Sequence, residues 1–159
     1  MNIFVDEHVQ VLQSLLRNNV SFILIGGYAV IHYGYSRTTG DMDIWLQLGT
    51  ENKNNLLKAL AEFGIESDDL NQLEAMDFTK PMPVFFIGEA PRRIDFITAV
   101  NNIRFEEAIT EVNYFPVEDI RIPVIQYQHL LLTKSGTSRA KDLADIEELK
   151  RINKYRDQS

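Results

Sequence analysis

The sequence predicts one α+β domain, in which a mixed β-sheet packs against helices. Short segments rich in β-branched and aromatic residues alternate along the chain with longer segments whose apolar residues recur at helical spacing. The two kinds of segment do not follow a strict strand–helix–strand order, which favours a mixed sheet over a wholly parallel one. The 159 residues contain no internal repeat, low-complexity tract or linker. We therefore expect a single domain over 1–159, with core motifs in 20–98 and a helical part in 126–155.

The first elements are expected to be a helix, a buried strand and a second, short helix. Apolar residues recur at helical spacing over 5–18. Residues 21–25 are apolar on both faces, which is typical of a buried strand. This strand ends at Gly26-Gly27, and residues 28–33 then predict a short helix.

The middle of the chain predicts a strand, a helix and an irregular segment. Residues 41–48 alternate between polar and apolar side chains, as in a strand with two different faces. Apolar spacing predicts a helix over 51–63, which Gly64 closes. Two prolines near the end of 65–83 disfavour a regular helix there, so we expect this segment to be irregular.

The next part of the chain predicts a hairpin, a short helix and an extended segment. Residues 84–88 and 92–98 are two apolar-rich segments joined by Glu-Ala-Pro, which favours a hairpin. A short helix is expected over 103–110, and a single extended segment over 112–123.

Two helices are expected to close the chain, over 126–134 and 139–155. The apolar positions that we expect to pack them on the core are Leu130, Leu131, Leu143, Ile146, Leu149 and Ile152. Phe85 and Phe86 are also expected to lie in the core.

Composition excludes several classes of protein. Without any cysteine the chain can hold no disulfide, thiolate nucleophile, cysteine-ligated zinc or iron–sulfur cluster, and we expect a reducing, cytoplasmic compartment. No apolar run reaches the roughly 18 residues that a membrane span needs. Asp6 and Glu7 stand where a signal peptide carries positive charge, so we expect neither export nor membrane association.

The charge of the chain is unevenly distributed. The net charge of −7 argues against a large nucleic-acid-binding surface but leaves room for a local basic pocket. From Lys134 to the end, seven basic and five acidic residues give +2. This end is either a solvated helix with paired charges or a face turned toward a polyanion.

The turn at Gly26-Gly27 is the first of three features that carry chemistry. Glycine permits a positive φ and lets another group approach the backbone closely. Free N–H groups at the start of the following helix would then bind a phosphate. The alternative is a purely structural turn, and the spacing matches neither a P-loop nor a dinucleotide-binding fingerprint.

Asp41 and Asp43 form the second feature. Residues two apart in a strand point to the same face, so two carboxylates lie side by side. Their repulsion raises the pKa of one of them unless a cation lies between, and hard oxygen ligands of this kind suit Mg²⁺. The alternative is an exposed strand face with two acidic side chains.

Asp95 is the third feature. It interrupts an otherwise apolar strand, where a carboxylate is costly to bury unless it is paired or metal-bound. A third carboxylate beside Asp41 and Asp43 would complete a two-metal clamp. Alternatively, Asp95 faces water or pairs with Arg92 or Arg93.

Together these features resemble the signature of the nucleotidyltransferase superfamily of the DNA polymerase β type. In that family a Gly-Gly or Gly-Ser turn is followed by Asp-x-Asp or Asp-x-Glu, and a third acidic residue lies on a later strand. The matching residues here are Gly26, Gly27, Asp41, Asp43 and Asp95.

The tail strengthens the resemblance. Lys134-Ser-Gly-Thr-Ser-Arg139-Ala-Lys141-Asp142-Leu-Ala-Asp145 is similar to the Lys…Arg-x-(Lys/Arg)-Asp-x-x-Asp motif of a bacterial branch. That branch includes abortive-infection-type nucleotidyltransferase toxins and relatives of small antibiotic-modifying enzymes. The resemblance covers roughly 20–150 and implies a nucleotidyltransferase-like fold.

The resemblance implies transfer of a nucleoside monophosphate from an NTP to a hydroxyl, with release of pyrophosphate. By this analogy Asp41, Asp43 and Asp95 would be the catalytic residues and would hold Mg²⁺, and Asp95 would help to deprotonate the acceptor hydroxyl. Gly26 and Gly27 would cradle the phosphates.

The same resemblance assigns nucleotide-binding roles in the rest of the chain. Arg37, Lys134 and Arg139 would contact the phosphates, and Asp142 would orient Lys134 or Arg139. Each role has a structural alternative: Arg37 would pair with the carboxylates, Lys134 would cap its helix, and Asp142 would form a salt bridge.

The acceptor and the partners are left open by the resemblance. An NTP would be the donor, and the acceptor would be a small molecule such as an antibiotic, a tRNA end or a protein side chain. A partner protein is a further expectation, since toxin–antitoxin and phage-defence systems use this fold. Two other functions fit the same residues: a catalytically degenerate nucleotide-binding or antitoxin module, and a two-metal phosphodiesterase.

Overall fold

Six strands form one mixed sheet in the computed structural model, which describes residues 6–36, 39–81, 84–89 and 92–154. Along the sheet the strands are β3 (Phe85–Ile87), β4 (Ile94–Ile97), β2 (Met42–Leu46), β1 (Phe22–Ile25), β6 (Ile120–Val124) and β5 (Asn113–Val117). β1 runs antiparallel to β2 and parallel to β6, and β2 runs parallel to β4. The edge strands β3 and β5 each pair antiparallel with their neighbour.

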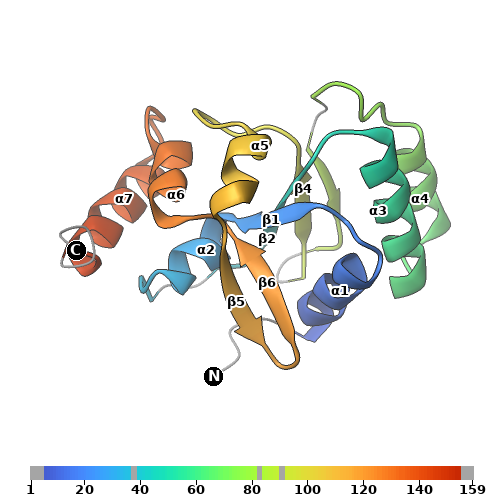
Figure 1. Cartoon of the computed structure of the whole chain (residues 1–159), viewed down its shortest axis with the longest axis horizontal. Helices are drawn as coiled ribbons and strands as arrows, with labels where there is room; N and C mark the ends of the chain where they lie inside the picture. Colours follow the sequence, from blue (N-terminus) through green and yellow to red (C-terminus); the bar gives the residue numbers. More distant parts are fainter. Residues whose placement is uncertain (1–5, 37–38, 82–83, 90–91, 155–159) are drawn as a thin grey trace.

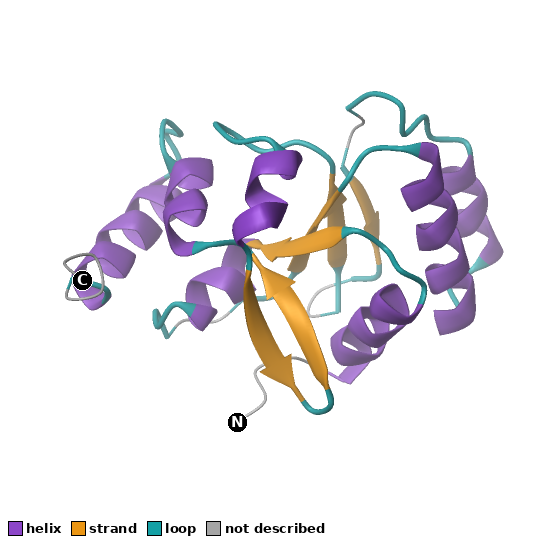
Figure 2. Cartoon of the chain, viewed as in Figure 1, coloured by secondary structure: helices purple, strands orange, loops and turns teal. Residues whose placement is uncertain are grey.

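Two groups of helices flank the sheet (Figures 1 and 2). The group on the right of Figure 1 consists of α1 (Asp6–Arg17), α3 (Thr50–Phe63) and α4 (Ser67–Glu74). The other group consists of α2 (Gly26–His32), α5 (Phe105–Ala108) with the 3₁₀ helix η1 (Ile109–Glu111), α6 (Tyr127–Lys134) and α7 (Ala140–Ile152). This architecture confirms the predicted α+β fold. Within the described ranges, no helix is long and apolar enough to cross a membrane.

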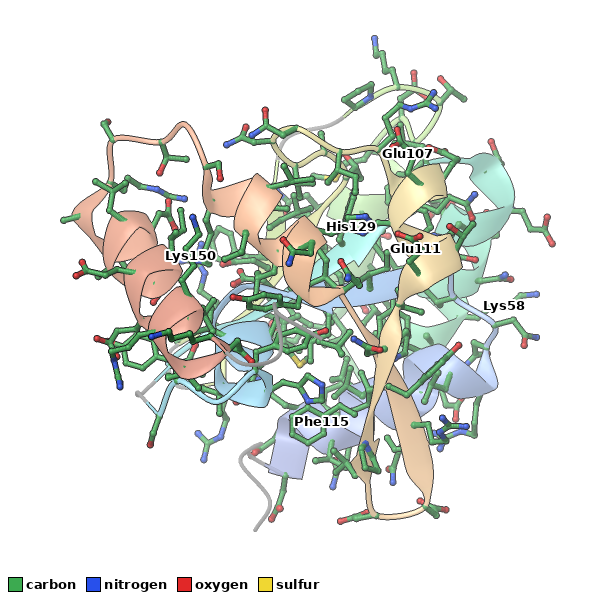
Figure 3. All side chains as sticks on the ribbon, turned by 60° about the vertical axis from the view of Figure 1, so that its left-hand side comes forward. Lys58, Glu107, Glu111, Phe115, His129 and Lys150 are labelled. Carbon is green, nitrogen blue, oxygen red and sulfur yellow. The ribbon has the colours of Figure 1, made fainter. Side chains whose placement is uncertain are left out.

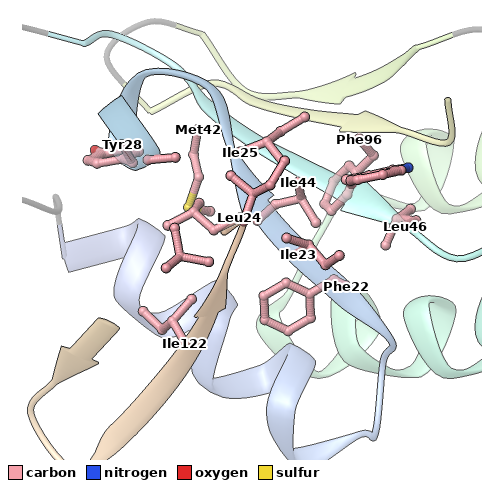
Figure 4. Packing of buried hydrophobic residues seen from close by; sticks show 14 of the residues in the cluster. Phe22, Ile23, Leu24, Ile25, Tyr28, Met42, Ile44, Leu46, Phe96 and Ile122 are labelled. Atoms are coloured by element: carbon pink, nitrogen blue, oxygen red, sulfur yellow. The ribbon is translucent and has the colours of Figure 1, made fainter. Parts of the chain in front are cut away.

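The core forms around β1, whose four residues are all buried. This strand lies in the middle of the sheet, so its apolar side chains meet neighbours on both faces (Figure 4). Ile44 and Phe96, on β2 and β4, are fully buried in the same cluster. A segment that is apolar on both faces thus becomes a central strand, as predicted from 21–25.

Polar contacts join α6 and the end of α7 to other helices of the same group. Nε2 of His129 on α6 lies 3.2 Å from Oε2 of Glu111 on η1, and the two side chains face each other in Figure 3. Asn153, which follows α7, donates a hydrogen bond from Nδ2 to the carbonyl oxygen of Tyr33 after α2. These contacts tie α6 to η1 and the end of α7 to the end of α2.

The expectation of irregular structure over 65–83 is wrong for its first half, which contains α4. Asp68 and Asp69 lie in the first turn of this helix, where acidic side chains are favourable, and Leu73 anchors it in the core. The prolines of the segment lie beyond the helix and therefore do not disturb it.

The expectation of one extended segment over 112–123 is also wrong, because the segment folds into the hairpin β5–β6. Glu118 makes the turn with a φ of +52°. Neither glycine nor asparagine marks this turn, so the sequence carries no strong signal for it.

Three apolar side chains that were expected in the core are exposed: Phe86, Leu143 and Ile152. Phe86 lies on the edge strand β3 and faces away from the core. On α7 the buried residues are Asp142, Asp145 and Leu149, so this helix turns an acidic side inward and leaves Leu143 outside. The lysine that makes this orientation favourable belongs to the site.

Candidate active site

Strand register brings two of the predicted carboxylates together. Asp43 on β2 is paired with Asp95 on the parallel strand β4, and with Ile25 on β1. Residues paired in this way point to the same face, one strand spacing of about 4.8 Å apart. Asp43 and Asp95 therefore lie side by side, at the point where β1 runs into the glycine turn.

Asp43 is the most perturbed acid of the site. Burial raises its pKa to about 7, and the nearby charges of Asp95 and Asp41 and a hydrogen bond with Asp95 act in the same direction. The charge of Lys134 opposes them. Near neutral pH Asp43 is therefore partly protonated unless a cation enters.

Asp95 is held from its other side by Arg93. The Nε of Arg93 donates a hydrogen bond of 2.8 Å to Oδ1 of Asp95, and this bond raises the pKa of the guanidinium. The same guanidinium lies 4.0 Å from the ring centre of Phe86. Arg92, the other predicted partner of Asp95, instead pairs with Glu7 at 2.8 Å.

The glycine turn is shaped by Asp43. Gly26 has a φ of +71°, and a Cβ at this position would overlap the carboxylate of Asp43. The position therefore needs glycine for two reasons: the backbone conformation and the close approach of the acid. Gly27 is buried in the first turn of α2.

Replacing Gly26 with alanine is expected to cost more stability than replacing Gly64. Both residues have a positive φ, but Gly64 has open space where a Cβ would lie. Gly64→Ala should therefore lose about 1 kcal/mol through backbone strain alone, whereas Gly26→Ala also displaces Asp43. Urea unfolding of both variants measures the difference, and equal losses would contradict the described contact with Asp43.

Lys134, at the end of α6, is a buried cation enclosed by two acids of α7. Its Nζ lies 2.9 Å from Oδ2 of Asp145 and 3.2 Å from Oδ1 of Asp142. Oδ2 of Asp142 accepts further hydrogen bonds from Thr137 at 2.9 Å and from Arg139 at 2.8 Å. Burial alone would raise the pKa of Asp142. The hydrogen bonds from Thr137 and Lys134 outweigh this effect, so the pKa is lowered.

We expect Asp145→Ala to lower the free energy of unfolding by about 3 kcal/mol, because it removes one acid from a buried lysine. Glu148→Ala on the same helix breaks the exposed pair with Arg151 and should cost less than about 1 kcal/mol. Chemical denaturation of the two variants provides the comparison. Equal losses in the free energy of unfolding would show that the ion pairs of Lys134 are no stronger than the exposed pair between Glu148 and Arg151.

A cavity of about 440 Å³ lies between the paired carboxylates and the lysine. Its polar lining consists of Gly26, Gly27, Asp43, Asp95, Asn101, Thr133, Lys134, Arg139, Lys141 and Asp142. Its apolar lining consists of Ile25, Val84, Ile97, Ala99 and Val100. Acids from the sheet thus face basic side chains from α6, α7 and their connection, which is an arrangement suited to a phosphorylated ligand and a cation.

Not all predicted site residues meet there. Asp41 precedes β2, is partly exposed, and acts on Asp43 through its charge without lining the cavity. Among the residues that the structure describes, no three acidic or histidine side chains are grouped closely enough to hold a metal ion together. Arg37 lies outside the described residues. Asn101, Thr133 and Lys141 line the cavity but were not predicted as site residues. Lys141 stands in the tail motif, whereas no sequence signal singled out Asn101 or Thr133.

Comparison with known proteins identifies the family of this chain. The family described as "Nucleotidyl transferase of unknown function (DUF2204)" matches residues 5–159. The chain belongs to this family. The predicted superfamily and the predicted enzyme class, a nucleotidyltransferase, are thereby confirmed. A comparison with curated proteins gave no match.

A solved structure shares the fold of this nucleotidyltransferase. It is the lincosamide antibiotic adenylyltransferase LnuA with lincomycin bound, at a TM-score of 0.60 and 19% sequence identity. The match covers 96% of this chain and 99% of LnuA. The two folds therefore correspond over nearly their whole lengths.

Proposed function

We propose that this nucleotidyltransferase transfers a nucleoside monophosphate from an NTP to a hydroxyl group, in the cavity between Asp43, Asp95 and Lys134. The observation that carries the proposal is one cavity with two touching carboxyls on one side and basic side chains on the other. The acceptor oxygen forms a bond to the α-phosphorus, and the bond from that phosphorus to the bridging oxygen breaks. Pyrophosphate leaves, and the hydroxyl proton passes to a carboxylate.

The donor atoms fit Mg²⁺. Carboxylate oxygens are hard ligands. The pKa of Asp43 is raised first by burial and then by the negative charges of Asp95 and Asp41, and a cation would compensate those charges. Asp43 and Asp95 would hold the ion. Asp41, which is not grouped with these two acids in the structure, would contribute through its charge. When bound, Mg²⁺ would neutralise negative charge on the phosphate oxygens.

The protein's own groups would position the reactants. Lys134 and Arg139 would bind phosphate oxygens, with Asp142 keeping both side chains in place through the contacts described above. Gly26 and Gly27 would let the phosphates approach the backbone. The oxygen of Asp95 that is not bound to Arg93 would accept the proton of the acceptor hydroxyl.

A small molecule is the acceptor class that we propose. The structural neighbour of matching length is named for a lincosamide antibiotic substrate, and the cavity has the size of a small-molecule site. A tRNA end or a protein side chain would be the alternative acceptors, and a partner protein would be needed only if the isolated chain is inactive.

The test is pyrophosphate release from each NTP with Mg²⁺, in the presence of lincomycin, bulk tRNA or the protein alone. Mass spectrometry of the acceptors identifies the product. The proposal expects pyrophosphate release that matches the addition of one nucleoside monophosphate. A degenerate binding module would bind NTP without releasing pyrophosphate, and a phosphodiesterase would cleave a diester without adding a nucleotide.

A further inference from the structure

We propose that Phe86 and Arg93 are positioning residues that fix the carboxylate of Asp95 for metal and nucleotide binding. This inference rests on the proposed function of the site. It concerns the outer edge of the sheet, on the side of Asp95 away from Asp43.

The side chains of Phe86, Arg93 and Asp95 lie on one face of the sheet, with Arg93 in contact with both of the others. Arg93 is two residues before Asp95, so both point the same way, and Phe86 on β3 is the register partner of Asp95. The guanidinium lies 4.0 Å above the centre of the Phe86 ring, and its Nε donates to Oδ1 of Asp95 at 2.8 Å. The contact with the ring fixes the orientation of the guanidinium plane. This orientation sets the direction of the hydrogen bond from Nε of Arg93 to Asp95.

Burial does not account for Phe86. It is 51% exposed on an edge strand, so the ring keeps only about half of the hydrophobic gain of a fully buried phenylalanine. The contact with Arg93 gives the ring a role, since an arginine over an aromatic face contributes about 0.5–1 kcal/mol at exposed sites.

The consequence for the site is a fixed orientation of Asp95. With Oδ1 engaged by Arg93, the carboxyl cannot rotate freely, and it remains in hydrogen-bonding contact with Asp43. A carboxylate held in this way is ready to act as a ligand together with Asp43. Loss of the ring should therefore weaken Mg²⁺-dependent nucleotide binding without changing any charge.

The opposite edge of the sheet offers a matched control. There the guanidinium of Arg121 on β6 lies 4.7 Å from the ring centre of Tyr114 on β5, and Tyr114 is 48% exposed. Tyr114→Leu removes the same kind of contact from the same kind of strand, far along the sheet from Asp95.

The experiment measures the Mg²⁺ concentration that gives half-maximal NTP binding, by calorimetry, for five proteins: wild type, Phe86→Leu, Phe86→Tyr, Arg93→Lys and Tyr114→Leu. We expect Phe86→Leu and Arg93→Lys to raise this concentration about two- to fivefold. Arg93→Lys keeps the charge and loses the planar group. Phe86→Tyr should resemble wild type because it keeps the ring, and Tyr114→Leu should also resemble wild type.

Two results separate the possible failures. Wild-type binding that Phe86→Leu leaves unchanged, or that Tyr114→Leu weakens equally, would overturn the positioning role and leave the proposed function intact. A wild type that binds no NTP in the presence of Mg²⁺ would overturn the proposed function itself, and the positioning role with it.

Discussion

Asp43→Asn is expected to lower the rate of pyrophosphate release by at least about a hundredfold. The substitution keeps the size of the side chain and removes the carboxylate that lies between Gly26, Asp95 and the basic wall of the cavity. A neutral amide is a poor ligand for Mg²⁺ compared with a carboxylate, so the charge of the phosphates would no longer be compensated. Initial rates at saturating NTP measure the effect.

Asp119→Asn serves as the control for this variant. Asp119 is exposed in the turn between β5 and β6, at the far end of the sheet from the cavity. Its replacement should leave the rate unchanged. Equal rates for Asp43→Asn and wild type would show that the cavity is not where transfer takes place.

Asp43→Asn should be more stable than wild type above neutral pH. Asp43 has a pKa of about 7 in the folded protein against an ordinary value of 3.8, so the folded state binds a proton more tightly than the unfolded chain. Below the ordinary value both states are protonated and the effect vanishes. As the pH rises to about 7 the wild type loses stability, and above it the full penalty, at most about 4 kcal/mol, is present.

Trp45 makes this difference measurable. It is the single tryptophan, it is buried, and it lies two residues after Asp43 on β2. Urea unfolding, followed by the fluorescence of Trp45, should show that Asp43→Asn is more stable than wild type at about pH 8 and equally stable near pH 4. Millimolar Mg²⁺ should stabilise wild type at the higher pH and leave the variant unchanged. A variant that is less stable than wild type at the higher pH would contradict the raised pKa.

Much of the site could be predicted from the sequence, because its positions follow from simple periodicity. The alternation in 41–48 places the acids on one face, and the apolar segment that ends at Gly26 predicts a central strand beside it. Asp95 stands out as a carboxylate in an apolar strand. The parallel register of β2 and β4 then pairs Asp95 with Asp43.

Other parts depend on tertiary contacts that periodicity does not reveal. The inward acidic side of α7 is stable only because Lys134 arrives from another helix, so Leu143 was placed on the wrong side. Phe86 reads as a core residue in the sequence, and only its edge position and Arg93 explain its exposure. Asp41 was predicted as the first residue of the strand over 41–48, but it precedes β2 and does not join the other two acids in a group of three.

Asp43, Asp95 and Lys134 are proposed to enclose a site that binds an NTP together with Mg²⁺. The most direct measurement is calorimetric titration of each of the four NTPs with and without Mg²⁺, on wild type, Asp43→Asn and Asp95→Asn. We predict wild-type binding that requires Mg²⁺ and that both variants lose. No binding of any NTP at millimolar concentration, or binding that needs neither Mg²⁺ nor the two carboxylates, would contradict the claim.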